Sequence, residues 1–513
     1  PRRRAVDTGT PDLAARLRDV ADRTPDRTAL LWQDRQVTYA ELDRRVDAAA
    51  GGLQRLGAGP GDRVALMLGN TPHFVEAYLG ALRAGATAVP VNTALTAPEV
   101  EHILTDSGAR VMVAAESVGP VLDHLPRAAL EHLIVAGGRQ RTAAALTSTW
   151  QELLDRGDPL REAQRHPDEV AVLLYTSGTT GRPKGAMLTR RNLAANQDQV
   201  LATPLAVRTD DVVLTVLPLF HVYALNVGLG SVIRVGATLV LTERFDPVRT
   251  LDLLDRHGVT VVLGAPPMYI AWLNTPGVTQ AGWPRVRVAV SGAAPLSAAV
   301  LERFRDTVGI TIWEGYGLTE AAPAVTSTAV ARLAKPGSVG RPLPGVELRL
   351  VDEQGRDVET GDPGEVWVRG PNVFPGYWGD AAATEQAFAP GGWLRTGDIG
   401  ILDGEGDLRL VDRKKDLIIV SGFNVYPREV EEALHRHPEV VTAAVVGIDH
   451  PYTGEAVKAF VVAREGSDLT EDEVVSWCRG RLARFKCPQA VTFVDELPVT
   501  STGKVRRVQL RST

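Results

Sequence analysis

Short apolar runs alternate with helix-like patterns along the first part of the chain, and this alternation restricts the possible folds more than any other feature. A helix pattern over residues 37–57 ends in glycine. A buried-strand pattern over residues 63–68, a helix pattern over 72–85 and a second strand pattern over 86–91 follow it. Because parallel strands need a long crossover connection, usually a helix, this order predicts a parallel sheet packed between helices.

The same alternation returns between residues 170 and 319, where the apolar runs are again short enough for buried strands. The strands expected there span residues 212–217, 238–241, 259–263 and 286–291. A chain of 513 residues is too long for one ordinary domain, so we expect a large domain of the α/β class followed by a small one.

The pattern changes after Pro323. Short alternating segments at residues 347–352 and 365–369 are joined by a turn-rich stretch, and Asp403-Gly404 separates two further apolar segments as in a hairpin. These features predict a small antiparallel β unit.

A charged break, VDRKKD at residues 411–416, precedes the last part of the chain. The patterns beyond it are a helix, two strands and a helix, at residues 430–437, 440–447, 456–463 and 471–484. About 100 residues with this mixture are enough for a small α+β domain.

Composition argues against several classes of protein. The net charge of −6 gives no bulk attraction to nucleic acid, and no apolar run reaches the roughly 18 residues that span a bilayer. The basic start, PRRR, has no apolar stretch behind it, and Cys478 and Cys487 are too few for a disulfide framework. We expect a cytoplasmic protein. A basic run from Arg479 to Lys486 leaves open a peripheral contact with the inner membrane surface, although a solvated helix face is the simpler interpretation.

The most distinctive segment combines glycines, hydroxyl groups and a lysine directly after the apolar run at residues 170–174. Its members are Thr176, Ser177, Gly178, Thr179, Thr180 and Gly181, followed by Lys184. Glycine lets backbone approach a ligand closely, and hydroxyl and amide groups donate to phosphate oxygens. The pattern is not a Walker loop, because Pro183 stands where that motif has glycine. We interpret it as a phosphate-binding loop rather than a flexible linker.

The segment YTSGTTGRPKG resembles the signature of the adenylate-forming superfamily, which includes acyl-CoA synthetases, firefly-type luciferases and the adenylation domains of peptide synthetases. Further motifs of that superfamily follow in its order, so the resemblance covers almost the whole chain. They are LPLFHVYAL (217–225), SGAAPL (291–296), WEGYGLTEAAP (313–323), WLRTGD (393–398), VDRKKDLIIVSGFNVYPREVE (411–431) and STGKVRR (501–507).

The resemblance implies a domain plan and a reaction. A large N-terminal domain, residues 1–411, would hold two parallel-sheet α/β subdomains and a small β-barrel. A hinge at residues 412–416 would join it to a small, mobile α+β domain at 417–513. The implied enzyme is an acid–thiol ligase: a carboxylate and ATP give an acyl-AMP and pyrophosphate, and the thiol of coenzyme A then releases AMP. Its cofactors would be ATP, Mg²⁺ and coenzyme A.

The resemblance also assigns the nucleotide site. Tyr316 would stack on adenine, with the flanking glycines letting the ring lie flat. Thr319 would lie near the α-phosphate and Glu320 would bind Mg²⁺, which prefers oxygen ligands. Asp398 would accept hydrogen bonds from the ribose, assisted by Arg413. Taken alone, such residues are also typical of core packing, a helix-start charge and a turn.

Other residues are expected to contact the cofactors because they match the same motifs. Thr180 would share the metal with Glu320. The expected contacts from SGAAPL and EGYG are Gly292, Ala293, Ala294, Glu314, Gly315 and Gly317.

The resemblance gives the small domain three roles. Lys504 would reach the carboxylate oxygen and the α-phosphate, where a cation stabilises the charge gathered during adenylation. Lys415 would be the pivot of the domain rotation. Gly422 would line the tunnel for the pantetheine arm, where a Cβ would obstruct the thiol. An unimportant surface lysine and a charged linker residue are the ordinary alternatives.

The motif LFHVYAL bears on the substrate. His221 resembles the histidine that flanks the carboxylate site of acyl-CoA synthetases. Amino-acid-activating relatives usually carry an aspartate here to hold the ammonium group, and this motif has no acid. We expect an apolar, glycine-rich acyl pocket. Its predicted members are Val222, Leu225, Gly228, Gly264, Met268, Gly292 and Gly315.

The motifs together are most similar to those of bacterial medium- and long-chain fatty acyl-CoA ligases, which predicts a fatty acid as the substrate. A coumarate-like aryl acid and transfer to a carrier-protein thiol stay open, as does a silent binding protein on the same fold. The absence of HExxH, CxxC and GxSxG argues against zinc and serine hydrolases. The sequence carries no signal for an oligomeric state.

Overall fold

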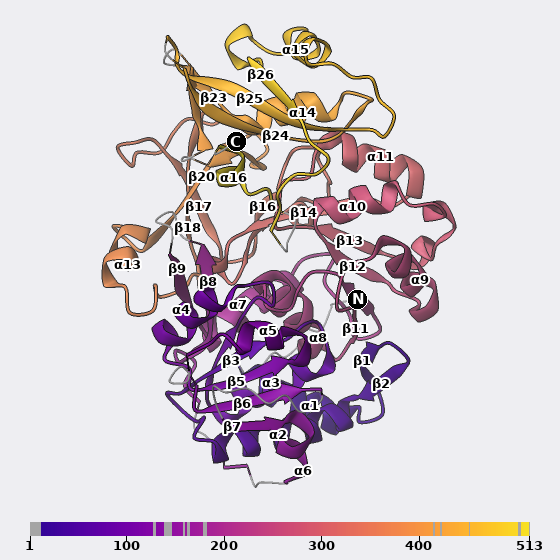
Figure 1. Ribbon diagram of the computed structural model, residues 1–513, viewed down its shortest axis with the longest axis vertical. Helices are drawn as coiled ribbons and strands as arrows, with labels where there is room; N and C mark the ends of the chain where they lie inside the picture. The colour runs from indigo at the N-terminus through magenta and orange to yellow at the C-terminus, as the bar shows by residue number, and fades with distance from the viewer. Residues whose placement is uncertain are drawn as a thin grey trace.

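A seven-stranded sheet forms the lower part of the molecule in Figure 1. The computed structural model describes residues 12–126, 130–137, 146–156, 160–161, 165–177, 182–413, 416–420, 423–450, 452–500 and 504–511, and the strand counts given below refer to these residues. The sheet has the order β7-β6-β5-β3-β4-β8-β9, in which β9 alone runs antiparallel to its neighbour. Its strands are β3 (Arg63–Met67), β4 (Thr87–Pro90), β5 (Val111–Ala115), β6 (His132–Ala136), β7 (Leu146–Thr149), β8 (Val170–Ser177) and β9 (Pro183–Thr189).

A second, nine-stranded sheet has the order β16-β15-β14-β13-β12-β10-β11-β1-β2. Its six central strands are parallel, and β2, β15 and β16 pair antiparallel at its two ends. The strands are β1 (Thr28–Trp32), β2 (Arg35–Thr38), β10 (Val212–Thr215), β11 (Thr238–Leu241), β12 (Val261–Gly264), β13 (Val288–Ser291), β14 (Ile312–Gly317), β15 (Ala324–Ser327) and β16 (Arg341–Pro342). The prediction of parallel sheets with helical connections is confirmed.

The helices of this region follow the capping rules that the sequence suggests. Helix α3 begins with Pro72 after the N-cap Thr71 and ends before Gly85, whose φ of 87° is the left-handed conformation that glycine adopts at little cost. The helices are α1 (Leu13–Arg23), α2 (Tyr39–Arg55), α3 (Pro72–Ala84), α4 (Ala97–Ser107), α5 (Gly119–Leu122), α6 (Trp150–Asp155), α7 (Arg190–Leu201), α8 (Ser231–Val235), α9 (Pro247–His257), α10 (Pro266–Leu273), α11 (Ala298–Val308) and α12 (Thr328–Ala331). The helix predicted from residue 37 begins at Tyr39, because Arg35–Thr38 forms β2.

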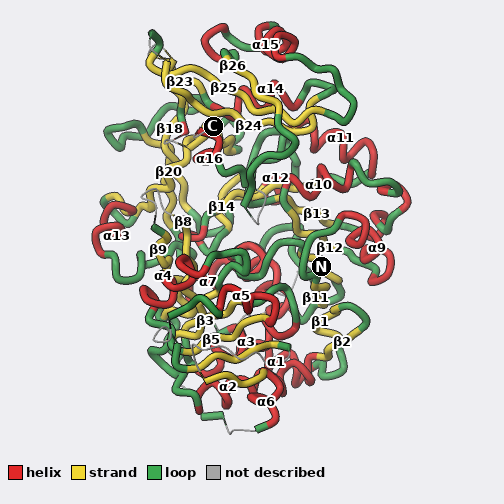
Figure 2. The backbone as a smooth tube through the Cα atoms, in the orientation of Figure 1, coloured by secondary structure: helices red, strands yellow, loops and turns green. Residues whose placement is uncertain are grey.

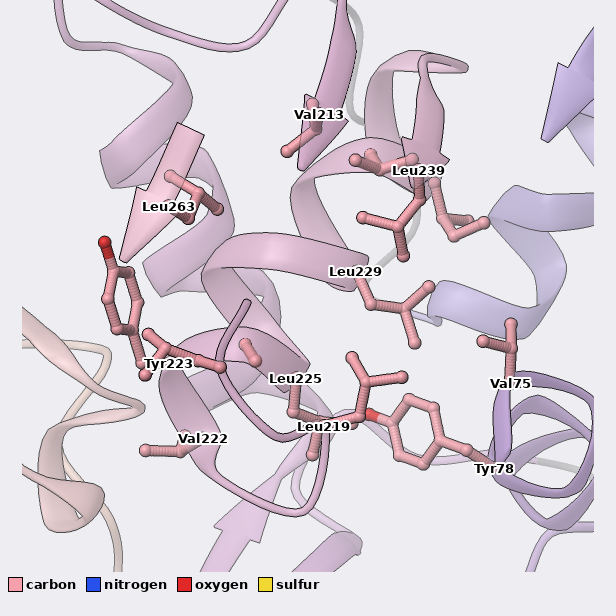
Figure 3. Packing of buried hydrophobic residues seen from close by; sticks show 14 of the residues in the cluster. Val75, Tyr78, Val213, Leu219, Val222, Tyr223, Leu225, Leu229, Leu239 and Leu263 are labelled. Carbon is pink, nitrogen blue, oxygen red and sulfur yellow. The ribbon is translucent and has the colours of Figure 1, made fainter. Parts of the chain in front are cut away.

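One hydrophobic core runs through both parallel sheets. Figure 3 shows Val75 and Tyr78 of α3 close to Leu219, which belongs to the second half of the domain. Leu229 and Leu239 continue this core toward the nine-stranded sheet. Because the two halves bury their apolar faces against each other, the first 320 residues or so behave as one packed body rather than two independent units.

The antiparallel unit forms a five-stranded sheet on the left of Figure 1, where the sequence predicts a small β-barrel. It comprises β17 (Glu347–Val351), β18 (Pro363–Arg369), β19 (Phe388–Ala389), β20 (Trp393–Leu402) and β21 (Leu408–Arg413), with α13 (Ala381–Ala387) before β19. The predicted hairpin at Asp403-Gly404 is present, since β20 and β21 pair antiparallel on either side of it.

The C-terminal unit lies at the top of Figures 1 and 2. Its five-stranded sheet has its own apolar core, as expected for a small α+β domain. The elements are β22 (Ile418–Val420), β23 (Phe423–Val425), α14 (Pro427–His435), β24 (Val440–His450), β25 (Gly454–Ala463), α15 (Glu471–Arg479), β26 (Ala490–Phe493) and α16 (Arg507–Arg511). Within the described part of the chain, no helix is long and apolar enough to cross a membrane.

A buried asparagine joins the two halves of the large domain. Asn70 lies between β3 and α3, and its side-chain amide donates to the Leu217 carbonyl over 2.9 Å. Its carbonyl oxygen accepts from the Leu219 amide over 2.7 Å, and the residue is 3% exposed. Asn70 therefore fixes the segment that leads from β10 to His221.

We expect Asn70→Ala to lower the free energy of unfolding by about 2–4 kcal/mol, because it leaves two buried backbone groups without partners. Urea denaturation measures this loss. Asn274→Ala is the control, because the Asn274 side chain bonds to Arg303 at the surface and its removal should change stability by about 0.5 kcal/mol or less. Equal stability of the two variants would contradict the assigned role of Asn70.

Candidate active site

A cavity of about 2000 Å³ is lined by residues of both α/β sheets, the antiparallel unit and the C-terminal unit. It brings together most of the residues that the sequence predicts. Those lining it are Thr176, Lys184, His221, Gly292, Ala293, Ala294, Gly315, Tyr316, Gly317, Thr319, Glu320, Asp398 and Lys504. Residues separated by more than 300 positions in the sequence therefore share one space.

Some predicted residues are not placed in this cavity. Gly178, Thr179, Thr180, Gly181, Lys415 and Gly422 lie outside the described residues. Ser177 and Arg413 are described in their backbones only, as the last residues of β8 and β21. Glu314 is described fully and does not line the cavity.

The strand pair β8–β9 positions the phosphate-binding candidates. Its register places Thr176 directly opposite Lys184, at the end of the hairpin where the predicted loop connects the strands. The Lys184 ammonium lies 3.3 Å from a carboxylate oxygen of Asp380 and 5.7 Å from the centre of the Tyr377 ring. Because Lys184 is held on a strand edge rather than a free loop, its cationic end has a defined position.

Glu320 lies in a short 3₁₀ turn, Thr319–Ala321, that follows β14. Its Oε1 accepts a hydrogen bond of 2.8 Å from the Tyr377 hydroxyl, and its backbone carbonyl accepts one of 2.8 Å from the Phe374 amide. Tyr377 and Asp380 were not predicted from the sequence. The signal that could have identified them is the aromatic and glycine-rich segment FPGYWGD between two strands.

The surroundings of Glu320 fit Mg²⁺. Mg²⁺ is usually bound by one or two carboxylates together with substrate phosphates, rather than by a complete protein cage. Glu320 offers one carboxylate in the cavity that also contains Lys184. Among the described residues, no group of three or more His, Cys, Asp or Glu side chains is arranged to hold a metal. This donor set suits a metal shared with ATP.

Tyr316 and Asp398 form the candidate nucleoside site. The Tyr316 hydroxyl donates to Asp398 Oδ2 over 2.6 Å, which links β14 to β20. The strand register places Arg413 opposite Asp398. Glycine is required at position 317 for a different reason from the expected one. A Cβ there would lie 2.1 Å from the Pro323 carbonyl oxygen. The chain needs glycine at this position for its own backbone packing.

The loop after β13 approaches the cavity closely. A Cβ added to Gly292 would lie 2.9 Å from Cε1 of Tyr223, so this glycine leaves room for the aromatic ring. Ala293 follows with a φ of 68°, a left-handed conformation that costs a residue with a Cβ some strain. Such strained residues cluster at ligand sites, and Ala293 also lines the cavity.

Glu314 is buried behind this loop. Its Oε2 accepts a hydrogen bond of 3.3 Å from the Leu296 amide. Burial raises the pKa of Glu314 to about 8, and the nearby Arg428 acts in the opposite direction. Arg428 lies in the first turn of α14. The charge on the Glu314 carboxyl is therefore coupled to the C-terminal unit. The arrangement makes Glu314 a support of the loop, not a group that faces the cavity.

His221 and Lys504 meet at the cavity from opposite parts of the chain. Burial lowers the pKa of His221 to about 4, and the positive charge of Lys504 acts in the same direction. The imidazole is therefore neutral at pH 7. Its Nδ1 accepts a hydrogen bond of 3.3 Å from the Tyr223 amide, which assigns the ring proton to Nε2. Lys504 is held in a turn, with its carbonyl accepting from the Thr500 amide.

One part of the cavity, here called the apolar arm, is lined mainly by apolar side chains. Its lining residues differ from those of the predicted acyl pocket. Val222, Gly292 and Gly315 line it as expected, together with Tyr223, Val227, Leu263, Ile270 and Val290. Leu225, Gly228, Gly264 and Met268 do not line it. Residues Tyr223–Gly230 form a π-helix, whose wider turn changes which side chains share a face. Figure 3 shows Tyr223 beside Leu263, whereas Leu225 belongs to the buried core near Leu219.

Two residues of the basic run in the C-terminal unit have partners within the protein. The Lys486 ammonium lies 2.7 Å from both carboxylate oxygens of Glu429, and the Arg481 guanidinium lies 3.3 Å from the centre of the Trp477 ring. These contacts favour a role of Arg481 and Lys486 within the protein over a contact with a membrane surface.

The family model described as AMP-binding enzyme matches residues 17–378, and the one described as AMP-binding enzyme C-terminal domain matches residues 429–504. Long-chain-fatty-acid–CoA ligase of Yersinia pestis is 38% identical over 524 residues, covering 96% of this chain and 92% of that protein. Feruloyl-CoA synthase of Amycolatopsis sp is 40% identical over 493 residues, covering 96% of each.

A solved structure shows the same fold over nearly the whole chain. The crystal structure of ATP-bound MatB from Rhodopseudomonas palustris has a TM-score of 0.89 at 34% identity, covering 98% of both chains. The match of the family model to most of the large domain and the near-complete overlap with these relatives lead to one conclusion. The chain belongs to the AMP-binding enzyme family, in the adenylate-forming superfamily.

Proposed function

We propose that this protein is an AMP-forming acid–CoA ligase and that its substrate is a medium- or long-chain fatty acid. The observation that carries the proposal is that one cavity contains a phosphate-binding candidate, a nucleoside site, an apolar arm and Lys504 of the C-terminal unit. Lys504 is close enough to His221 for its charge to affect the pKa of that ring. A cation at the junction of the nucleotide and acyl sites is what adenylation requires.

In the first step, an oxygen of the fatty carboxylate attacks the α-phosphorus of ATP. The bond from that phosphorus to the pyrophosphate oxygen breaks, and acyl-AMP forms. Lys504 stabilises the negative charge that gathers at the α-phosphate, while Lys184 and Thr176 hold the distal phosphates. Glu320, with Thr180 as a further ligand, would hold Mg²⁺, which would supply additional charge neutralisation. His221 is neutral and carries its proton on Nε2. It donates a hydrogen bond to the substrate carboxylate and so orients it.

In the second step, the coenzyme A thiolate attacks the acyl carbonyl carbon, and AMP leaves as the carbon–oxygen bond to phosphate breaks. Adenylation and thiol attack need different surroundings of the same carbonyl group, and Lys504 serves the first of them. We therefore propose that the unit at residues 417–513 rotates relative to residues 1–411 about the hinge at 412–416, with Lys415 as pivot. Gly422 would then line the path of the pantetheine arm.

The apolar arm supports a fatty substrate. Val222, Val227, Leu263, Ile270 and Val290 line it without a charged side chain among them, so an alkyl chain would be buried favourably. The relative from Yersinia pestis is named a long-chain-fatty-acid–CoA ligase. An aryl acid is the second candidate, because Tyr223 offers an aromatic face in the arm and the Amycolatopsis relative is named a feruloyl-CoA synthase.

We place the reaction in the cytoplasm. Cys478 and Cys487 are both free and buried in the C-terminal unit. A reducing compartment suits such a thiol pair. Arg481 and Lys486 have partners within the protein, so a peripheral contact of this basic run with the inner membrane surface would rely mainly on Arg479 and Arg484.

A panel of acids tests the substrate. We expect saturated fatty acids between C8 and C18 to give the highest rates of thioester formation from ATP and coenzyme A, with coumarate and benzoate far slower, because the arm is lined mainly by aliphatic side chains. Thioester detection by mass spectrometry measures the rates. A clear preference for aryl acids would overturn the fatty substrate but not the reaction. Pyrophosphate exchange without any thioester would favour a carrier-protein acceptor, and no exchange with any acid would favour a silent binding protein.

A pair of variants tests the two-step mechanism. Lys504→Ala should lower acid-dependent ATP–pyrophosphate exchange by at least about 100-fold, because transition-state charge loses its cation, and should leave thioester formation from supplied acyl-AMP nearly unchanged. Gly422→Leu should slow thioester formation and leave ATP–pyrophosphate exchange nearly unchanged, because the leucine side chain obstructs only the thiol path. Each variant is the control for the other. Equal loss of both steps in either variant would contradict the division of roles.

A further inference from the structure

The segment at residues 376–380 touches two groups that the proposed mechanism uses separately. Asp380 pairs with Lys184, and the Tyr377 hydroxyl donates to Glu320. The Tyr377 ring also lies below the Lys184 ammonium, 5.7 Å from its centre. In Figure 1 this segment precedes α13, beside β8 and β9. Tyr377 has no role in the mechanism proposed above.

The backbone of this segment is fixed on the edge of β9. Tyr377 forms a bridge with Ala186, the Met187 amide donates to the Gly376 carbonyl, and the Trp378 amide donates to the Gly185 carbonyl. The Tyr377 amide itself donates to the Thr384 hydroxyl over 2.9 Å. The position of Tyr377 therefore follows that of the strand that carries Lys184.

The hydroxyl of Tyr377 then connects this strand to a different sheet. Glu320 follows β14 of the nine-stranded sheet, whereas Lys184 is on β9 of the seven-stranded sheet. The Tyr377 hydroxyl donates to Glu320 Oε1 over 2.8 Å. A carboxylate has about four lone-pair sites, and one hydrogen bond leaves the others for a cation.

The contact between Lys184 and Asp380 is of a different kind. Both side chains are partly exposed, 25% and 38% respectively, so this ion pair contributes little and can be exchanged for a phosphate group at small cost. Lys184 is thus available to a nucleotide, while Glu320 keeps its bond to Tyr377.

We propose that Tyr377 is a positioning residue that fixes the Glu320 carboxylate relative to Lys184, so that the protein presents its metal ligand and its phosphate-binding cation in one arrangement. The inference rests on the proposed function, because it takes Glu320 as the Mg²⁺ ligand. It adds a residue that acts through Glu320 without touching the reacting atoms. Loss of the hydroxyl raises the Mg²⁺ concentration that ATP binding requires and leaves metal-free binding unchanged.

Tyr377→Phe removes the hydroxyl and keeps the ring, including its edge contact with Phe374 at 5.0 Å and its face toward Lys184. We expect the Mg²⁺ concentration for half-maximal ATP binding to rise by about tenfold, the cost of a lost hydrogen bond to a charged group. Isothermal titration calorimetry of the full chain with ATP, in the absence of acid and across a Mg²⁺ series, measures this value. ATP affinity in EDTA and the thermal unfolding midpoint should match those of the wild type.

Two further variants make the test specific. In a Glu320→Gln background, Tyr377→Phe should add no further change in the Mg²⁺ requirement, because the two residues act as one unit. Tyr39→Phe is the chemical control: its hydroxyl donates to the Ala237 carbonyl over 2.7 Å, Tyr39 does not line the cavity, and loss of the hydroxyl should leave the Mg²⁺ requirement unchanged.

The outcomes separate this inference from the proposed function. A Tyr377→Phe variant with the wild-type Mg²⁺ requirement would overturn the positioning role, as would an equal loss of ATP affinity with and without Mg²⁺. Additive effects of the Tyr377 and Glu320 substitutions would overturn it too. A wild-type chain that shows no Mg²⁺-dependent ATP binding would instead refute the proposed function, and the inference with it.

Discussion

A parallel strand with apolar residues on both faces has to be covered on both sides, and the arrangement of this molecule follows from that requirement. The runs at β3, β4, β10 and β12 leave no polar face for solvent, so other elements must cover both faces of each parallel sheet. The carboxyl ends of the strands then emerge together at one edge of each sheet. Backbone groups that no ladder satisfies are available there, which is why ligand sites form at such edges.

The cavity uses the ends of particular strands from both sheets. β13 ends at Ser291 and β14 at Gly317, and each leads into a segment that lines the cavity, while Thr176 lines it close to the end of β8. The two sheets come from distant stretches of sequence, so side chains must connect them. Asn70 does this beneath the site, and Tyr377 does it beside Glu320. The precision of the site thus depends on a few buried polar contacts between otherwise apolar layers.

Much of this could be predicted from the sequence. Periodicity placed β3, β4 and β10 to β13 correctly within a few residues, because a buried strand is recognisable from its own composition. The motifs identified Lys184, Tyr316, Glu320, Asp398 and Lys504, which the cavity indeed brings together.

The errors arose where neighbours far along the chain decide the outcome. The π-helix at Tyr223–Gly230 moved Leu225 out of the expected pocket, and no local pattern marks the extra residue in its turn. Gly317 has to be glycine because of Pro323, a contact that spacing does not reveal. Glu314 belongs to a motif whose neighbours face the cavity, yet its own side chain points into the protein. Residues 178–181, 415 and 422 lie outside the described residues, so their roles stay predictions.

Lys504 comes from a different unit from Lys184, Tyr316, Glu320 and Asp398, and it follows all four in the chain. During synthesis on a ribosome, Lys184, Tyr316, Glu320 and Asp398 emerge long before it. The nascent large domain can assemble its nucleotide-binding surface, with Asn70 and Tyr377 in place, while the lysine is still inside the exit tunnel. In the proposed mechanism Lys504 promotes acyl-AMP formation, so a chain still in synthesis would lack the cation that forms this reactive intermediate.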